Sequence, residues 1–488
     1  MINKKESFKW DIKYLVKTFI CLLVIFIFWV LPPVEPITSM GMKVIGVFIG
    51  TVLLLSIVDT IWPVFLSFLL LSMTGVMSLN EVIQGSLGNW IFAFVVASMI
   101  MTNALNESGF TARLTSKILT MKISRKSPWS FMFVYFGICY LVGCFMDQVP
   151  ATAFFLAFSN EIINRIGYDA KSKFSNTLVL GSIFSVILGG AATPISHPLA
   201  ILGIGIFEQT TQMEISLFEY MVYAVPTTLI LLALLFAIIR FIIKPDVEKA
   251  KDLDVDKFSE DIKPMQLREK AIASIFFITV IFWVLPGVLQ IFLPKDNLIL
   301  MMLKKYSITF WAFLAVILLA FIRIDNKPLI DLKEEMNKKI PWATIFFISI
   351  GVLLGSAVSN EGVGLNDFVI LKLRPIIDNS STMLVVLLFA LGTCTLTNFS
   401  SNVSTITIMT GVAASIAMVS PSLSPHALCI TTTMCGSLAY VLPSSFAPIA
   451  MLHADDNSDS NLIIKIGILM VVLSGIAASL IGYNILAN

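Results

Sequence analysis

Apolar segments of roughly 17 to 25 residues recur along the whole chain, and an α-helix needs this length to cross a bilayer core of about 30 Å. Hydrophobic residues make up 57% of the 488 residues and charged residues only 13%. Soluble domains carry about a quarter charged residues. The chain is therefore predicted to be an all-α polytopic membrane protein.

We expect eleven transmembrane spans, two of which are interrupted. The run from Gly189 to Pro198 and the run from Pro443 to Pro448 contain prolines that no continuous helix accommodates. Irregular backbone at membrane depth is tolerated only where it is buried in protein or lines a water-filled cavity. The expected spans lie near residues 18–31, 42–58, 61–77, 90–106, 175–204, 217–243, 271–293, 308–323, 342–358, 425–452 and 463–486.

Two further apolar stretches are expected to form re-entrant hairpins. In the first, arms at 129–146 and 152–164 meet at Asp147-Gln148-Val149-Pro150. The second covers 383–418 and has its tip near Ser401-Asn402, inside a run of hydroxyl and amide side chains at 397–408. Polar side chains at this depth favour a solute-binding role.

The charges of the connections indicate an orientation. The connections 33–41, 78–89, 205–216 and 420–424 contain no Lys or Arg, whereas 107–128, 165–174, 244–270 and 324–341 are rich in both. By the positive-inside rule the second group is cytoplasmic. We therefore expect a multi-pass protein of the inner or plasma membrane with a cytoplasmic N-terminus.

The two halves of the chain match each other. An offset of 254 residues carries Gln148 onto Asn402 at the two tips, and an offset near 250 carries 197–200 onto 447–450 at the two breaks. Each half has an odd number of spans, so the halves should enter the membrane from opposite sides, as in secondary transporters. We expect an N-terminal helix (1–40), a first inverted repeat (41–243), a cytoplasmic linker (244–270) and a second inverted repeat (271–488).

The tip Ser401-Asn402-Val403 resembles the second Ser-Asn-Thr signature of the divalent anion:sodium symporters, the dicarboxylate transporter family within the ion transporter superfamily. The stretches 342–367 and 443–448 are also similar to that family. The resemblance implies a homodimer that works by an elevator mechanism. It also implies a small anionic substrate held between the tips, sodium as the coupling ion and no other cofactor or nucleic-acid partner.

The resemblance also implies site residues by position. The second sodium site would use Thr397, Asn402 and Ser445, and an altered first cation site would use Asp147, Gln148 and Ser196. The expected substrate-binding residues are those of the tips and breaks: Ser401, Asn402, Val403, Asp147, Gln148, Val149, Pro198 and Pro448.

The first tip departs from the family pattern, because Asp147-Gln148-Val149 stands where the family has Ser-Asn-Thr. A carboxylate close to a dianion is unfavourable at low dielectric constant. Asp147 has three interpretations: a cation ligand, a proton carrier or the N-cap of the following helix. His197 at the first break is either its partner or a buried histidine bonded to a backbone carbonyl.

We therefore predict a secondary active transporter of small organic anions such as C4-dicarboxylates, coupled to sodium. The alternatives are a sodium-independent anion exchanger and a proton-linked carrier of another anion such as citrate or sulfate. An ion channel is the competing class. An enzyme is not expected, because no catalytic motif such as His-Glu-x-x-His occurs.

Overall fold

The computed structural model describes residues 11–252, 264–294 and 296–487. In these ranges the chain is almost entirely helical, apart from one antiparallel hairpin of β1 (Arg323–Ile324) and β2 (Lys327–Pro328). The prediction of an all-α protein is confirmed. The middle of the predicted linker 244–270, residues 253–263, lies outside the described residues.

The helices of the first half follow the predicted segments closely. The breaks and turns fall at the predicted residues, and the additional helices are short. The elements are α1 (Ile12–Val30), α2 (Ser39–Ile57), α3 (Trp62–Thr74), α4 (Leu79–Gly85), α5 (Trp90–Glu107), α6 (Phe110–Leu119), α7 (Pro128–Gly143), α8 (Gln148–Ile166), α9 (Lys173–Ala192), α10 (Pro198–Thr211), α11 (Leu217–Ala237), η1 (Ile238–Ile243) and η2 (Lys249–Asp252).

The second half contains the same kinds of element. They are α12 (Leu267–Phe292), α13 (Leu298–Lys305), α14 (Ile308–Phe321), α15 (Leu332–Glu334), η4 (Glu335–Lys339), α16 (Trp342–Ser359), η5 (Glu361–Val363), α17 (Leu365–Asp378), α18 (Thr382–Phe399), α19 (Asn402–Val419), α20 (Pro425–Gly436), α21 (Ala447–Ala454), α22 (Ser460–Ala477), η6 (Ala478–Gly482) and α23 (Tyr483–Ala487).

Ten helical stretches among the described residues are long and apolar enough to cross a membrane, or eleven if α13 and α14, bent by 66°, form one span. Only the upper figure equals the eleven spans predicted, and the members differ. Both arms of the second predicted hairpin, α18 and α19, are 18 residues long and qualify. The predicted span in α3 has only 13 residues and does not.

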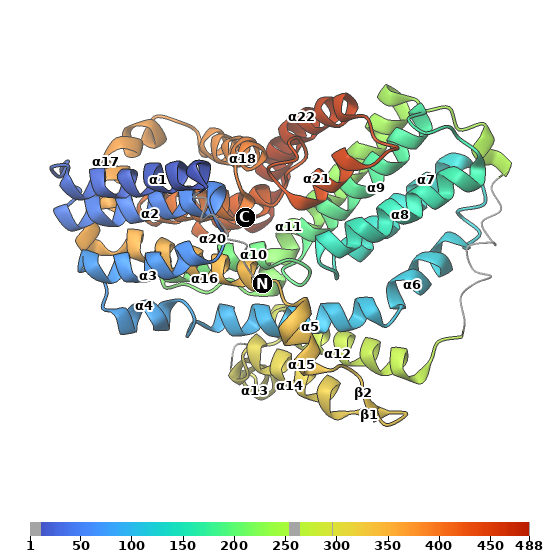
Figure 1. The fold of residues 1–488 in the computed structure, drawn as a ribbon, viewed down its shortest axis with the longest axis horizontal. Helices are drawn as coiled ribbons and strands as arrows, with labels where there is room; N and C mark the ends of the chain where they lie inside the picture. Colours follow the sequence, from blue (N-terminus) through green and yellow to red (C-terminus); the bar gives the residue numbers. More distant parts are fainter. Residues whose placement is uncertain (1–10, 253–263, 295, 488) are drawn as a thin grey trace, which may run out of the picture.

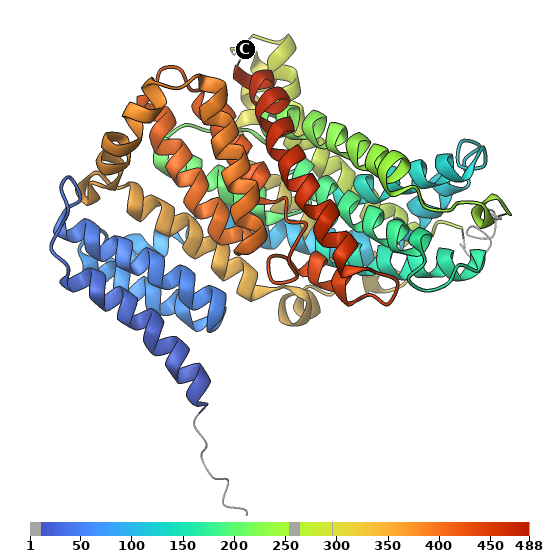
Figure 2. The ribbon, with the colours of Figure 1, turned by 90° about the horizontal axis from the view of Figure 1, so that it is seen from above.

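The helices gather in groups. Figure 1 shows α1–α4 at one end of the molecule and α7, α8 and α9 at the other, and Figure 2 shows the same separation from above. The first group has its own apolar core, which it shares with α16. A larger core joins most of the remaining helices.

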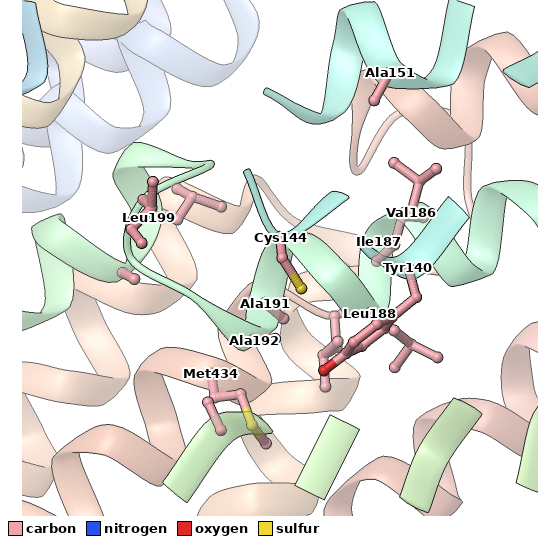
Figure 3. Close-up of a cluster of buried hydrophobic side chains, with 14 of the residues drawn as sticks. Tyr140, Cys144, Ala151, Val186, Ile187, Leu188, Ala191, Ala192, Leu199 and Met434 are labelled. Atoms are coloured by element: carbon pink, nitrogen blue, oxygen red, sulfur yellow. The ribbon is translucent and has the colours of Figure 1, made fainter. Parts of the chain in front are cut away.

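Helix α9 is enclosed by the rest of the protein, and every residue from Phe174 to Ala192 is buried. A helix that is apolar on all sides belongs in such a position. Side chains of α7, α8, α9, α10 and α20 meet at its end (Figure 3). The labelled members of this cluster are Tyr140, Cys144, Ala151, Val186, Ile187, Leu188, Ala191, Ala192, Leu199 and Met434.

The same order of elements occurs twice along the chain: a long helix, a short helix, a helical pair, a broken helix and a long helix. The first set is α5, α6, α7–α8, α9–α10 and α11, and the second is α16, α17, α18–α19, α20–α21 and α22. The sets interlock, because α10 packs against α16, α19 and α20 while α21 packs against α8 and α9. Each broken helix therefore supports the helical pair of the other half.

Candidate functional site

Both tips and both breaks line a single cavity of about 610 Å³. Asp147 and Val149 come from the first tip, and Ser401, Asn402 and Val403 come from the second. The breaks contribute His197 and the segment 443–447. Four segments that are far apart in the sequence thus converge at one place, as the repeat predicts.

The second tip is the N-terminus of α19. Ser401 is the N-cap residue, but its hydroxyl forms no capping hydrogen bond. Asn402 is 4% exposed, and its amide nitrogen has no hydrogen-bond partner. The unbonded backbone N–H groups of a first helical turn carry partial positive charge. This tip therefore presents hydrogen-bond donors.

Three oxygen atoms meet behind the second tip. The Thr397 hydroxyl lies 2.9 Å from Oδ1 of Asn402 and 2.5 Å from the carbonyl oxygen of Gly436. A hydroxyl has one proton, so Thr397 donates to only one of these two acceptors at a time. Hydroxyl, amide and carbonyl oxygens are the ligands that hard cations prefer. The cluster therefore offers oxygen atoms of the kind that bind hard cations.

Asn398 holds the second break in place, a role that its sequence position does not reveal. Its Oδ1 accepts hydrogen bonds from the backbone N–H groups of Tyr440 and Val441, at 2.7 and 2.9 Å. Its Nδ2 donates to the carbonyl oxygens of Cys394 and Leu438. Asn398 thus satisfies backbone groups that the interruption of the helix leaves unpaired.

Ser445 also belongs to the second break and lines the cavity. Its hydroxyl donates to the carbonyl oxygen of Leu442 at 2.6 Å. The prolines of the two breaks lie deeper. Pro198 and Pro448 are buried in the first turns of α10 and α21 and do not line the cavity, which is walled instead by their neighbours Leu199 and Ala447.

At the first tip, Asp147 is the N-cap of α8. Its Oδ1 accepts a hydrogen bond from the backbone N–H of Val149 at 3.0 Å. The N-cap interpretation is therefore confirmed, and the same carboxylate also lines the cavity. The neighbouring Val149 is 40% exposed there.

Gln148 turns away from the cavity into the protein. It is fully buried, its Nε2 donates to the carbonyl oxygen of Ile187 at 3.3 Å, and its Oε1 has no partner. A Cβ atom on Gly190 would lie 1.6 Å from that Nε2. Ser196, the remaining predicted member of the first cation site, is buried and donates to the carbonyl oxygen of Gly190.

The residue of the first half that matches Thr397 in sequence carries no hydroxyl. The offset of 254 places Gly143 opposite Thr397, and a Cβ atom on Gly143 would lie 2.5 Å from the carbonyl oxygen of Val186. Gln148 matches Asn402 but directs an N–H group, not an oxygen, at a carbonyl. An amide hydrogen in that position repels a cation. Gln148 and Gly143 therefore do not repeat the hydroxyl and amide oxygens that meet behind the second tip, although the buried Oε1 of Gln148 is left without a partner.

His197 is the N-cap of α10, and its Nδ1 accepts a hydrogen bond from the backbone N–H of Leu199 at 3.4 Å. A ring nitrogen that accepts carries no proton, so the imidazole is neutral. Its ring stacks on Phe446 of the second break. This hydrogen bond of His197 thus caps its own helix, α10.

Lys339 lines the cavity from η4, and no motif in the sequence marks it. Its Nζ lies 2.6 Å from Glu107 and 2.8 Å from Glu335. Burial lowers the pKa of Lys339, but the hydrogen bonds to the two glutamates outweigh it and raise the pKa above its usual value. Lysine at this position is therefore charged at neutral pH. The cavity wall also contains Met99, Thr102, Asn103 and Thr344, which the sequence does not mark as site residues.

Comparison with protein families agrees with this geometry. Residues 51–435 match the model of a family described as citrate transporter, CitMHS. The match covers most of the chain, including both tips.

Individual relatives are more distant. The sodium-dependent dicarboxylate transporter SdcS of Staphylococcus saprophyticus is 26% identical over 317 residues, and SdcS of Staphylococcus aureus strain USA300 is 23% identical over 328. Both alignments cover 64% of this chain and 59% of the relative. An uncharacterized transporter of Haemophilus influenzae is 23% identical over 456 residues, 92% of each chain.

Among solved structures, MtrF of Neisseria gonorrhoeae, described as illuminating a class of antimetabolite efflux pumps, has a similar fold. The TM-score is 0.55 at 12% sequence identity, over 96% of this chain and 94% of MtrF. This likeness concerns the fold alone.

Proposed function

Because this chain belongs to the citrate transporter family, a family of the divalent anion:sodium symporter type, we propose that it moves small organic anions across the membrane by secondary active transport. It is a transporter and not an enzyme. One observation carries the proposal: two tips and two breaks from the two halves of the chain line one cavity.

The second tip binds the carboxylate of the substrate. The free Ser401 hydroxyl, the unpartnered Nδ2 of Asn402 and the first backbone N–H groups of α19 are all donors at one end of the cavity. Helix N-termini and amide donors are common binding sites for anions. Such binding involves hydrogen bonds and partial charges only, with no redox step.

Sodium is the coupling ion in this proposal, and it binds behind the second tip. Thr397, Asn402 and the carbonyl oxygen of Gly436 hold it, with Ser445 on the adjoining break. Bound sodium supplies positive charge next to the substrate carboxylate. Gln148 and Gly143 do not offer the corresponding ligands, so the proposal places sodium at the second tip.

C4-dicarboxylates are the first substrates to test, because the SdcS relatives are named for dicarboxylates. A sodium-independent exchanger and a proton-linked carrier are the alternative forms of the same function. The re-entrant role of the hairpins, the elevator movement and a homodimer also remain proposals, supported by the repeated order of elements and the resemblance of the tips.

The test is uptake of labelled succinate and citrate into proteoliposomes, with and without an inward sodium gradient. We expect saturable uptake that internal substrate accelerates, which a channel does not produce. Thr397→Val should weaken the apparent sodium affinity by at least about tenfold, equivalent to ~1.4 kcal/mol. Thr393→Val is the matched control, because Thr393 lies one turn earlier in α18 and bonds only the carbonyl of Phe389. Unsaturable flux without counterflow would contradict the proposal.

A further inference from the structure

The charges around the cavity are unequal. Among its described lining residues, the charged side chains are Asp147 and Lys339. Lys339 already pairs with Glu107 and Glu335, so two carboxylates offset its single positive charge. His197 is neutral, because its Nδ1 accepts a hydrogen bond. The described lining thus supplies no surplus positive charge to balance Asp147.

The first tip also lacks the arrangement of oxygen atoms that lies behind the second tip. Directly behind it, Gln148 points an N–H group at the carbonyl oxygen of Ile187 and packs against Gly190. Gly143 provides no hydroxyl where the second half has Thr397. The two residues that match Thr397 and Asn402 therefore do not repeat the oxygen cluster of the second tip.

The two ends of the cavity therefore differ in hydrogen-bonding character. The second tip offers donors: the Ser401 hydroxyl, the Asn402 amide nitrogen and the start of α19. The first tip offers the carboxylate of Asp147, which uses one oxygen for the Val149 N–H and has acceptor capacity left. A symmetric dianion does not match such a pair of ends.

We propose that the substrate is a small monoanion with one ionised carboxylate and a hydrogen-bond donor at its other end. The carboxylate binds at Ser401-Asn402, and the donor, an amide or undissociated carboxyl group, binds to Asp147. This inference rests on the proposed transport function. A dicarboxylate fits the class only with one of its two carboxyl groups protonated.

The physical reason is the low dielectric constant of a cavity between packed helices. A second ionised carboxylate beside Asp147 would be repelled, whereas a donor group would form a charge-assisted hydrogen bond. Val149 and Val403 cannot compensate, since both side chains in the cavity wall are apolar. Asp147 therefore determines specificity for the group at the far end of the substrate.

The test compares succinate with succinamate, in which one carboxylate is replaced by an amide of the same shape. Binding to the purified full-length protein is measured by calorimetry in sodium buffer at about pH 8, where both carboxyl groups of succinate are ionised. We expect succinamate to bind at least about tenfold more tightly than succinate. Asp147→Asn should abolish or reverse this preference, and asparagine keeps the N-cap.

Asp459→Asn is the control, because Asp459 also caps a helix, α22, and lies away from the cavity lining. It should leave the preference unchanged. Asp147→Ser, which also keeps a capping side chain, replaces Asp147→Asn if that variant does not fold. Succinate binding as tightly as succinamate, or a preference that survives both Asp147 variants, would overturn the inference and leave the transport proposal intact. If neither compound binds to the wild type, the proposed function itself fails for this substrate class.

Discussion

The ring of His197 stacks on the ring of Phe446, with centroids 5.7 Å apart and planes inclined by 26°. Each residue is the N-cap of the second part of a broken helix, His197 for α10 and Phe446 for α21. The two breaks come from different halves of the chain and touch through this pair. The stack therefore fixes the distance between two walls of the candidate site.

Phe446→Leu should lower the stability of the protein by about 1 kcal/mol, because an aromatic pair contributes roughly this much beyond its buried area. His197→Leu should have a similar effect. The double variant should be less destabilised than the sum of the two, by about 0.5–1.5 kcal/mol. Thermal unfolding in detergent measures the stability of the wild type, the two single variants and the double variant. Strictly additive effects would show that the two rings do not interact.

Asn398→Ala should destabilise the second break and weaken substrate binding together. It leaves the N–H groups of Tyr440 and Val441 without their acceptor, and a buried unpaired group costs about 1–3 kcal/mol. Asn398→Asp keeps the acceptor oxygen but loses the donor to Cys394 and Leu438, so it should recover only part of both properties. Unfolding temperature and substrate affinity are the measurements. An alanine variant with unchanged binding would refute this supporting role.

Lys339→Met should destabilise the protein by about 3 kcal/mol, because it leaves Glu335, which is 1% exposed, as an unpaired buried charge. Glu335→Gln in the same chain should recover most of this loss. The pKa of Lys339 is raised, so the contribution of the ion pair is fully present below pH 10.5 and is lost as the pH rises beyond it. The measurement is denaturation at neutral pH. If Glu335→Gln does not recover the stability, the pairing of Lys339 with Glu335 is contradicted.

Gly190→Ala should displace Gln148, since the new methyl group would overlap its Nε2. Overpacking of this kind costs about 1–3 kcal/mol. Combining it with Gln148→Ala, which removes the overlapping atoms, should restore part of the stability. Equal instability of the single and double variants would mean that Gln148 does not occupy this position.

The positions of the tips and breaks could be predicted from the sequence, because prolines, glycines and polar residues inside apolar segments have few structural explanations. Asp147 and Ser401 both stand at helix N-termini, where the sequence predicts the tips to be. The short helices α6, α13 and α17 could not be predicted as readily. Each lies in a connection between two expected apolar segments, and hydropathy alone does not separate such a helix from a loop.

The side chains that line the site were harder to predict than the positions of the tips and breaks. Lys339 reaches the cavity from η4, and only the folded chain brings it near either tip. Gln148 belongs to the first tip in sequence, yet its side chain is buried beneath the cavity. The direction of the Gln148 side chain depends on the space left by Gly190, which local sequence does not disclose.

The enclosure of α9 has a consequence for labelling. A photoreactive lipid reacts with side chains that touch acyl chains, so it should modify α1 and α12, where most of the apolar surface is exposed, and spare α9. Substitutions in α9 are then limited by volume and not by polarity against lipid. A small hydroxyl side chain such as Ser182 is tolerated there, because it hydrogen-bonds to the Val179 carbonyl of the same helix and to Ser159 of α8.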